Sequence, residues 1–408
     1  MSKMKISSLF VLFLMIFCAQ GCRAAVETAA NPQAAIPSKN AAALDPIPTQ
    51  TPAPPLALAM YRGNPERDGL FTGDAPVENA SLLWQAEGAS PGASAALVGA
   101  QLLIGSPDGL SALDVQTGKL LWHTSTAGAV TSAPAYWSDM LFVGDSNGVL
   151  YALNSQTGER QWTYQSGGSI SSSPAVDESG VYFGSMDGYF YALDPRTGQE
   201  LWKFAVGGVS DPGSGISRGF QSAPALSGST LVIASAQRGG ASAELFVYAL
   251  DKSSGQKLWE YSTWNQITGP AIVGDVVYFG GFGTFTGLRL SDGEPVFNFE
   301  TDIVSSAPAI VDGAAIFGLD DGRVLAISLR TGEQKWSFNS GSAVVSAPSV
   351  SGQMVYFGTS TGTLYAIDIP SGQAMWIYET GERIASSPLL AEGAVFFSSD
   401  TGSVYALK

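Results

Sequence analysis

Few side chains in this sequence could serve as nucleophiles, general bases or soft-metal ligands. The 408 residues contain one histidine, His123, and two cysteines, Cys18 and Cys22. His123 directly follows a tryptophan in a strand-like stretch, with no cysteine, second histidine or serine–base pattern near it. So few imidazole and thiol groups leave little material for a zinc site or for histidine-based catalysis. We therefore interpret His123 as a surface residue and expect no catalytic or metal-binding residues.

Carboxylates are numerous, but their positions indicate turns rather than a site. The chain has 35 Asp and Glu against 20 Lys and Arg, a net charge of −15, which argues against binding the phosphate backbone of nucleic acid. Four acidic residues stand in predicted hairpin turns: Asp187, Asp320, Asp321 and Asp400. Asp is common in turns because its side chain accepts backbone hydrogen bonds. A turn role is therefore favoured, with calcium binding as the alternative.

These turns belong to a sequence repeat of about forty residues. The repeat is clearest in residues 151–162 (YALNSQTGERQW) and 191–202 (YALDPRTGQELW). Each copy ends in a large aromatic residue, and these residues are Trp84, Trp122, Trp162, Trp202, Trp259, Phe297, Trp336 and Trp376. Their spacing is 38 to 40 residues, except between Trp202 and Trp259, where it is 57.

Each repeat contains four short apolar runs separated by Asp-Gly and Thr-Gly pairs, a pattern typical of β-hairpins. Repeated four-stranded units of this length predict the blades of a β-propeller. Eight inner strands can be counted, but Tyr405–Leu407 at the end lacks an outer strand, and Leu82–Gln85 lacks inner partners. We therefore predict an all-β, eight-bladed β-propeller of four-stranded antiparallel blades. Pairing of the N-terminal strand with the last blade closes the ring and removes two free sheet edges.

The recurring residue types have separate structural roles in this prediction. Acidic residues such as Asp114 and Asp194 accept backbone N–H groups in the turn that follows. Glycines such as Gly198 permit the positive φ of that turn. The indole that closes each repeat covers the seam between neighbouring blades. Small residues begin the innermost strands because eight strands that converge on one axis leave little room.

The phrase Ala-x-Asp-x-x-Thr/Ser-Gly-x-x-x-Trp resembles the tryptophan-docking motif of pyrroloquinoline-quinone-like (PQQ-like) repeats, across residues 82–408. Residues 61–69 also resemble the segment that precedes the propeller in many bacterial proteins of this repeat type. The resemblance implies one of two branches. One branch contains PQQ-dependent dehydrogenases, which hold the quinone on the axis over a Trp, beside Ca²⁺ bound by Glu, Asn and Asp. The other is non-enzymatic and includes the BamB-type lipoproteins of outer-membrane protein assembly.

The resemblance favours the BamB-type branch. The mature chain has no adjacent cysteine pair of the kind that often covers the quinone, and no residue matches the quinone branch position by position. We therefore expect no enzyme activity and no cofactor, PQQ being implied by the family alone. The expected function is a protein-interaction scaffold: a monomeric propeller that binds a protein partner in the cell envelope. The alternatives are a PQQ-dependent oxidoreductase and a sensor that binds a small ligand in the axial funnel.

The N-terminal segment has the pattern of an export signal. Lys3 and Lys5 precede an apolar run, Ile6–Phe17, that is too short to be a comfortable transmembrane helix. The sequence Ala19-Gln20-Gly21-Cys22 resembles a bacterial lipobox, so we predict a signal peptide over 1–21 and lipidation of Cys22; the alternative is an ordinary cleaved signal with incidental cysteines. The Ala- and Pro-rich residues 22–59 are a predicted tether, followed by the propeller over 60–408. The protein is then anchored at the periplasmic face of an outer membrane or the extracellular face of a cell membrane.

The long interval between Trp202 and Trp259 marks a candidate contact surface. It contains two insertions, around Val209–Phe220 and Gln237–Glu244, in loops that leave blade 4 on the same face. Arg218 and Gly219 precede Ser222-Ala223-Pro224 much as an Arg-Gly pair precedes a Ser-Ala-Pro strand in the BamB-type partner-binding loop. Blade 5 adds aromatic residues to the same rim. The predicted partner-binding residues are Arg218, Gly219, Phe220, Arg238, Trp264 and Phe282.

Arg and Trp are enriched in interaction hot spots, and function often lies in loops on a rigid scaffold. The alternative is that these aromatic residues fold inward and pack the long loops. Trp137, on the opposite face, is interpreted as a packing residue.

Overall fold

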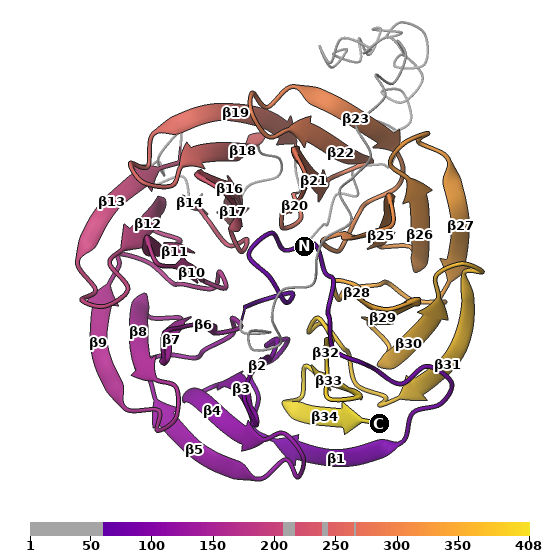
Figure 1. Cartoon of the computed structure of the whole chain (residues 1–408), viewed down its shortest axis with the longest axis horizontal. Coiled ribbons are helices and arrows are strands. Elements are labelled where there is room, and N and C mark those ends of the chain that lie inside the picture. The colour runs from indigo at the N-terminus through magenta and orange to yellow at the C-terminus, as the bar shows by residue number, and fades with distance from the viewer. Residues whose placement is uncertain (1–59, 207–216, 239–243, 265–266) are drawn as a thin grey trace, which may run out of the picture. The chain divides into compact units, whose positions relative to one another are not determined.

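The computed structural model describes residues 60–206, 217–238, 244–264 and 267–408. The predicted signal peptide, Cys22 and the tether lie outside the described residues. Within the described part, all strands but β14 (Ser217–Gly219) and β17 (Ala236–Arg238) belong to one of eight four-stranded antiparallel sheets arranged around an axis (Figure 1). The prediction of an eight-bladed β-propeller is confirmed. No helix among these residues has the length and apolarity needed to cross a bilayer.

Blade 3 shows how the sequence forms one sheet. It contains β10 (Ala175–Asp177), β11 (Gly180–Gly184), β12 (Tyr189–Leu193) and β13 (Glu200–Ala205), which pair in that order from the axis outward. The two central strands are buried on both faces and are almost continuously apolar, whereas β13 alternates between exposed and half-buried residues. Asp187 accepts the Tyr189 N–H at 3.0 Å in the β11–β12 turn, where Gly188 has a φ of +94°. Local chemistry thus sets each hairpin.

The other blades repeat this order. Blade 1 contains β2 (Ala96–Val98), β3 (Gln101–Ser106), β4 (Gly109–Asp114) and β5 (Leu120–Ser125); blade 2 contains β6 (Ala135–Trp137), β7 (Met140–Gly144), β8 (Val149–Asn154) and β9 (Arg160–Gln165). Blade 4 contains β15 (Ala225–Ser227), β16 (Thr230–Ala234), β18 (Glu244–Asp251) and β19 (Lys257–Trp264); blade 5 contains β20 (Ala271–Val273), β21 (Val276–Gly280), β22 (Thr284–Arg289) and β23 (Pro295–Glu300). Blade 6 contains β24 (Ala309–Val311), β25 (Ala314–Gly318), β26 (Arg323–Ser328) and β27 (Gln334–Asn339); blade 7 contains β28 (Ser349–Ser351), β29 (Met354–Gly358), β30 (Thr363–Asp368) and β31 (Gln373–Glu379).

Blade 8 combines the two ends of the propeller. Its strands are β32 (Leu389–Ala391), β33 (Ala394–Ser398), β34 (Ser403–Leu407) and, outermost, β1 (Leu82–Glu87). In the β1–β34 pair Leu82 lies opposite Leu407, and Trp84 lies opposite Ala406. Ser81 and Lys408 exchange two backbone hydrogen bonds, each 2.9 Å long. The predicted closure is therefore confirmed.

Indole rings join neighbouring blades as predicted. In five blades the indole Nε1 donates to a backbone carbonyl of the next blade at 2.7 to 3.1 Å: Trp84 to Val115, Trp162 to Pro195, Trp202 to Lys252, Trp259 to Leu290 and Trp336 to Ile369. Trp376 donates to Pro76, in the segment that leads to β1, and Trp122 donates to the Gln101 side chain instead. The acidic turn residue of the repeat also accepts hydrogen bonds as predicted. The Thr117 hydroxyl donates to Asp114 at 2.7 Å, which lowers the pKa of that carboxyl.

A segment before β1 closes one end of the axis. It starts near the axis and runs outward to β1 (indigo in Figure 1), and on its way it accepts backbone N–H groups from blades 4, 5, 6 and 7 at 2.8 to 2.9 Å. The buried guanidinium of Arg67 donates to the carbonyls of Pro174 and Pro224 at 2.9 and 3.1 Å, and to that of Tyr61. The segment thereby links most of the inner strands to one another.

Candidate functional site

The two insertions of blade 4 form one added element. Strand β14 (Ser217–Gly219) comes from the first insertion and β17 (Ala236–Arg238) from the second, and they pair as a separate two-stranded sheet (Figure 1). Arg218 lies opposite Gln237, and Ser217 lies opposite Arg238. The prediction that both insertions meet on one rim of blade 4 is confirmed. The rest of both insertions, residues 207–216 and 239–243, lies outside the described residues.

Gly219 has a packing role at the base of this ribbon. A Cβ at this position would lie 2.6 Å from the Cα of Met186, in the β11–β12 turn of blade 3. The next residue donates its backbone N–H to the Ser185 carbonyl at 3.1 Å. Because a real Cβ contact of this length does not occur, only glycine lets β14 cross the neighbouring turn so closely.

Phe220 is a core residue, and the prediction that it belongs to the contact surface is wrong. Its side chain is 0% exposed, and its ring lies 5.7 Å from that of Phe190 and 6.2 Å from that of Tyr248. It packs over Gly184 of blade 3, where a Cβ would lie 2.4 Å from the Cβ of Phe220. Other blades place a buried aliphatic residue at the same position, four residues before the proline: Val130, Ile170, Val304, Val344 and Ile384. The free energy gained by burying the large apolar ring therefore determines where Phe220 lies, although it follows an insertion in the sequence.

Two other predicted residues do present their side chains to solvent. Trp264, the last residue of β19, is 51% exposed, and Phe282, between β21 and β22, is 56% exposed. They are the only Trp and Phe among the exposed large hydrophobic residues of the described chain. Arg218 and Arg238 lie on the β14–β17 ribbon by their backbone placement, and the strand that follows β17 begins at Glu244, the ladder partner of Trp264. We call Trp264, Phe282 and the β14–β17 ribbon the blade 4–5 rim.

A cavity of about 310 Å³ lies on the axis, and we call it the axial funnel. Its lining consists of residues that directly precede the innermost strands, together with Tyr61 from the segment before β1. Serine, threonine, alanine and glycine dominate the lining, and none of the lining residues is Asp, Glu, Lys, Arg or Trp. The lining does not fit PQQ with Ca²⁺, because the quinone's carboxylates and the metal both require charged partners that these residues do not supply.

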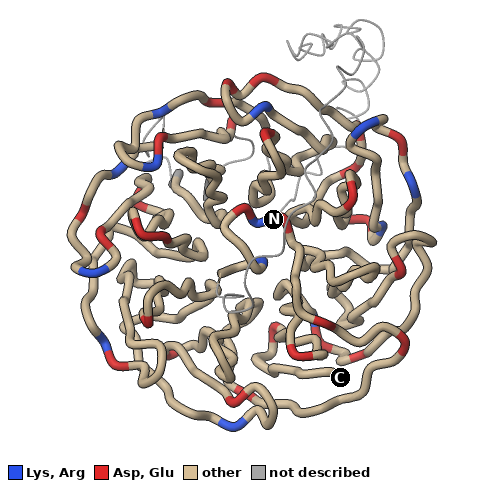
Figure 2. Tube along the Cα trace, in the orientation of Figure 1, with Lys and Arg blue, Asp and Glu red and all other residues tan. Residues whose placement is uncertain are grey.

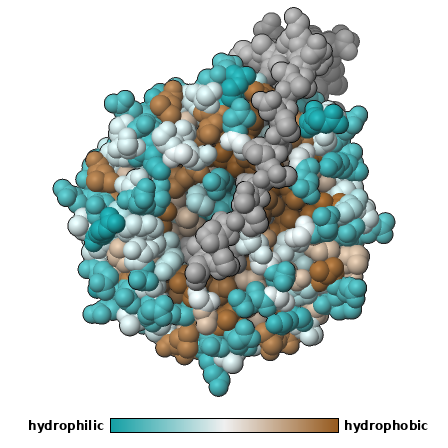
Figure 3. Space-filling view, in the orientation of Figure 1, coloured by the Kyte–Doolittle hydropathy of each residue, from teal (hydrophilic) through white to brown (hydrophobic). Residues whose placement is uncertain are grey.

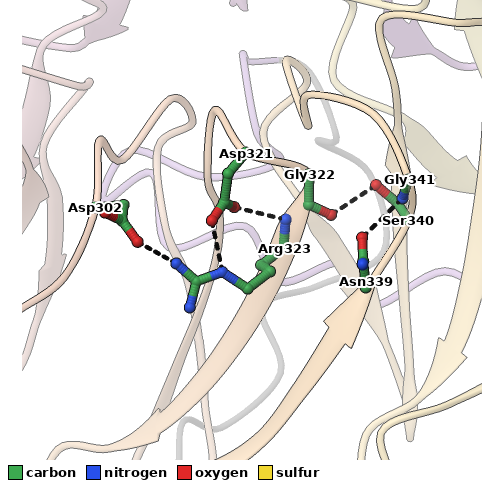
Figure 4. Close-up of polar contacts among 7 residues, drawn as sticks. All are labelled: Asp302, Asp321, Gly322, Arg323, Asn339, Ser340 and Gly341. Atoms are coloured by element: carbon green, nitrogen blue, oxygen red, sulfur yellow. Dashed lines mark hydrogen bonds and ion pairs between the residues drawn. The ribbon is translucent and has the colours of Figure 1, made fainter.

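Two of the four acidic turn residues, Asp187 and Asp321, accept backbone N–H groups, as the sequence favoured, whereas the Asp400 carboxylate accepts from Arg383 at 2.5 Å. Asp187 accepts the Gly167 N–H and the Tyr191 hydroxyl, both at 2.7 Å. Asp321 accepts the Arg323 N–H at 3.0 Å and its Nε at 2.6 Å, and Arg323 also contacts Asp302 (Figure 4). Asp and Glu residues are distributed around the whole ring (Figure 2). Within the described ranges, no group of three or more His, Cys, Asp or Glu residues is arranged to hold a metal ion.

His123 has two neighbours that the sequence analysis missed. Its Nδ1 lies 3.0 Å from the Ser111 hydroxyl, and its Nε2 lies 3.7 Å from an Asp108 carboxylate oxygen. Ser111 and His123 are direct cross-strand partners of β4 and β5, so the strand register is the signal that could have found them. Strand β4 pairs on both edges, so its N–H groups are used in the sheet and do not form an oxyanion hole. The trio is a surface contact, in keeping with the sequence interpretation.

Trp137 packs on the opposite face, as interpreted from the sequence. The guanidinium of Arg196 lies 4.7 Å from the centre of its ring. Such a stacked cation contributes packing and electrostatic attraction at the seam between blades 2 and 3.

Comparison with known proteins places this geometry in a family. A family model described as outer membrane protein assembly factor BamB matches residues 77–246 and 243–408. No curated protein sequence gives a significant match. Among solved structures, BamB from Moraxella catarrhalis is similar with a TM-score of 0.65 and 19% identity, covering 81% of this chain and 98% of that chain.

Other solved structures share the fold. The computationally designed Ika8 protein has a TM-score of 0.67 and 21% identity, covering 80% of this chain and 98% of that one. Quinohemoprotein alcohol dehydrogenase from Comamonas testosteroni has a TM-score of 0.71 and 15% identity, covering 86% of this chain and 80% of that one. Identities this low show a common fold only, whereas the family model spans nearly the whole propeller. The chain therefore belongs to the BamB family of PQQ-like repeat β-propellers.

Proposed function

We propose that this protein is an exported lipoprotein whose propeller is a non-catalytic scaffold for protein contacts in envelope or outer-membrane protein assembly. Family membership supports a role in assembly. The lipobox at Cys22 supports anchoring at the periplasmic face of an outer membrane or the extracellular face of a cell membrane. In this proposal the propeller works as a monomer and presents one rim to an envelope protein.

The observation that carries the proposal is the exposure of Trp264 and Phe282 beside an added ribbon. Elsewhere in the described propeller, tryptophan and phenylalanine side chains pack between blades or inside them. Leaving two large rings half exposed costs the free chain hydrophobic stabilisation, and such residues are typical anchors of protein interfaces. The propeller beneath them is closed by the β1–β34 pair, so a partner would meet a preformed surface with little ordering cost.

A capture experiment tests the rim. The full-length tagged protein is recovered from its own membranes with co-purifying partners, and the Trp264→Ala/Phe282→Ala variant is compared with wild type. Loss of two anchors should lower partner recovery about tenfold or more, and addition of Arg218→Ala should lower it further. Leu258→Ala is the matched control, because Leu258 is also 51% exposed but lies at the other end of β19 from Trp264. Equal recovery from all variants, with unchanged melting temperatures, would contradict the proposal that the blade 4–5 rim binds the partner.

The alternative from another class is a PQQ-dependent oxidoreductase. The fold likeness to quinohemoprotein alcohol dehydrogenase motivates the comparison, but the uncharged lining of the axial funnel argues against it. Incubation of the purified protein with PQQ and Ca²⁺ distinguishes the non-catalytic scaffold from the PQQ-dependent oxidoreductase. The scaffold proposal predicts that no chromophore is retained after desalting and that no dye is reduced with alcohols or sugars. A stoichiometric bound chromophore would contradict it.

A further inference from the structure

Six exposed aliphatic side chains lie together on the circumference of the ring. They belong to the outermost strands of three consecutive blades, β31 of blade 7, β1 of blade 8 and β5 of blade 1, which follow one another along the lower edge of Figure 1. The six are between 43% and 60% exposed, and they make up more than half of the exposed large hydrophobic residues of the described chain. We call these six residues the outer belt: Leu82, Leu83, Leu120, Leu121, Met375 and Ile377.

The same positions in most other blades carry a charge. The two residues before each docking aromatic residue stand at the start of the outermost strand, on the free edge of the sheet. Blade 5 has half-buried Pro295 and Val296 there. Blades 8 and 1 have two exposed leucines each, whereas blades 2, 3, 4 and 6 have at least one charged residue: Arg160, Glu200, Lys257 and Lys335. Charged side chains commonly protect edge strands from unwanted contacts, and the outer belt lacks this protection.

The composition of the outer belt indicates what covers it. Protein interfaces are enriched in Trp, Tyr and Arg at their energetic centres, and leucine is under-represented there. The outer belt has none of those three residue types, whereas the blade 4–5 rim has Trp264 and two arginines. Aliphatic side chains instead enter the hydrocarbon of a bilayer readily. The three belt strands also contain Glu87 and Glu379 but no Lys or Arg, so they do not favour an anionic surface.

The proposed lipid anchor would keep the propeller beside a bilayer. From Cys22 to Met60, the first described residue, there are 38 peptide links. A fully extended chain of that length spans at most about 130 Å. Lipidation of Cys22 therefore confines the propeller to this distance from the membrane, which raises the effective concentration of lipid and makes weak apolar contacts effective. The choice of a lipid surface thus rests on the anchoring in the proposed function.

We propose that the outer belt binds a zwitterionic lipid surface and inserts its aliphatic side chains into the interfacial layer. Strand β1 lies between β31 and β5, so a plane that meets the ring at blade 8 is flanked by the other two belt strands (Figure 1). Apolar side chains at such interfaces are buried to about 5–10 Å. Apolar residues also reach the lower edge of the face in Figure 3, where Figure 1 places β1 and β5.

This contact would orient the blade 4–5 rim. Blade 4 lies four blades from blade 8 in a ring of eight, on the opposite side of the axis (Figure 1). A bilayer at blade 8 therefore leaves Trp264 and Phe282 pointing away from the lipid, where a protein partner can reach them. One side of the ring contacts the membrane, and the other presents the rim.

A fluorescent label at two matched positions tests the contact. Leu83 and Leu258 each directly precede a docking tryptophan and are 43% and 51% exposed, but they lie in blades 8 and 4. In the proposed lipoprotein the thiol of Cys22 is acylated, so Leu83→Cys or Leu258→Cys adds the only free thiol for an environment-sensitive fluorophore. Each labelled lipoprotein is reconstituted into phosphatidylcholine vesicles that contain a spin-labelled quencher lipid. Quenching at position 83 should exceed that at position 258 by about threefold or more.

Two further changes test the apolar character of the contact. Leu120→Glu/Leu121→Glu, added to Leu83→Cys, should lower quenching about fivefold or more, because charged side chains resist entry into a bilayer. Melting temperatures report whether each variant is folded. Replacing about a third of the phosphatidylcholine with anionic phosphatidylglycerol should weaken quenching, because the chain has a net charge of −15 and the belt strands contain no Lys or Arg. Stronger quenching with the anionic lipid would show ionic binding and overturn the proposal.

The other outcomes also decide the proposal. Equal quenching at positions 83 and 258, or full quenching in the folded Leu120→Glu/Leu121→Glu variant, would overturn it. Protection of the label at position 83 in native membranes but not in protein-free vesicles would assign the outer belt to a protein, and would also overturn it. Mass spectrometry of Cys22 detects failure of the anchor separately. If Cys22 carries no acyl group, the proposed anchoring is wrong, but Cys22→Ser/Leu83→Cys should still be quenched at millimolar lipid; absence of quenching there would overturn the belt contact itself.

Discussion

Gly198 lies directly against the indole of Trp162, which belongs to the preceding blade. A Cβ at Gly198 would lie 2.7 Å from Cε3 of that ring, closer than any real Cβ contact. The same relationship joins Gly118 to Trp84 and Gly255 to Trp202. Each of these glycines also has a φ near +70°. Glycine thus has two roles at these positions: it permits the positive φ of the turn, and it leaves room for the indole of the preceding blade.

The Gly198→Ala substitution separates these two needs when it is compared with Gly274→Ala. Gly274 has a φ of +60°, and a Cβ added there would meet no atom within 4 Å, so its substitution costs only backbone strain. We expect about 1 kcal/mol of destabilisation at Gly274 and about 3 kcal/mol at Gly198, where overpacking against the indole is added. Urea unfolding measures both. Equal losses at the two positions would show that the indole contact does not constrain the blade seam.

The pair Leu82–Leu407 allows a direct test of ring closure. Leu82 lies opposite Leu407, next to Ser81 and Lys408, which exchange two backbone hydrogen bonds, and the register shifts between Leu82 and Trp84. Directly opposed residues of an antiparallel pair have Cα atoms about 4.5 to 5.5 Å apart, a spacing that a disulfide can span. Leu82→Cys/Leu407→Cys should oxidise readily and stabilise the propeller by about 4 kcal/mol through the long loop it closes.

The reduced form of the same variant is the control for that disulfide. Dithiothreitol should return the unfolding midpoint to that of the reduced protein, and a thiol assay should count the two added cysteines only after reduction. If the added cysteines stay free under oxidising conditions while the protein is folded, β1 does not lie beside β34.

The repeated chemistry explains why the fold could be predicted from the sequence. Each blade carries its own turn residues, central strands and indole, so eight weak local signals reinforce one another. Closure of the ring could be predicted because both ends of the repeat region are incomplete. The strand near Trp84 lacks inner partners and the strand near Tyr405 lacks an outer partner, and the two strands pair. The argument needed only the count and order of strands. Side-chain contacts across blades were not required.

The candidate rim was less predictable because its side chains are placed by tertiary packing. Phe220 stands next to an Arg-Gly pair in an insertion, and this neighbourhood suggested a surface residue. Alignment on the following proline, Pro224, would have matched it to buried Ile170 and Val304. Ser111 and His123 are twelve residues apart and meet only through strand register. Such contacts require the register, which sequence spacing alone does not supply.

Phe220 and Trp264 should respond in opposite ways to truncation. Phe220→Ala removes a fully buried ring, and we expect about 4 kcal/mol of destabilisation. Trp264→Ala removes a half-exposed ring, and we expect less than about 1 kcal/mol. Partner capture should be lost for Trp264→Ala at a temperature where both variants are folded. A stability loss at Trp264 that matches the one at Phe220 would identify Trp264 as a packing residue.

Arg67 should be one of the most sensitive polar residues in the chain. Its guanidinium is 1% exposed and donates to three carbonyls from the segment before β1 and from blades 3 and 4. Arg67→Ala leaves buried acceptors unpaired and should destabilise the propeller by about 3 kcal/mol. Arg67→Lys should not restore the loss, because one ammonium group cannot reach three separate acceptors. Arg330→Ala, at an exposed position, should change stability by less than about 0.5 kcal/mol.

Glu382 should give the propeller an acid-sensitive contact in blade 8. Hydrogen bonds from Ser399, at 2.6 Å, and from Thr401 lower the pKa of its carboxyl. Because the folded pKa lies below the unfolded value, the stabilisation is present above the unfolded pKa, about 4.3, and is lost as the pH falls through the folded pKa. Glu382→Gln should therefore reduce the loss of stability below about pH 4.5, measured by urea unfolding across pH. Glu78→Gln, at an exposed position before β1, is the control. If Glu382→Gln and wild type lose stability in parallel as the pH falls, the Ser399 and Thr401 hydroxyls do not stabilise the charged carboxylate.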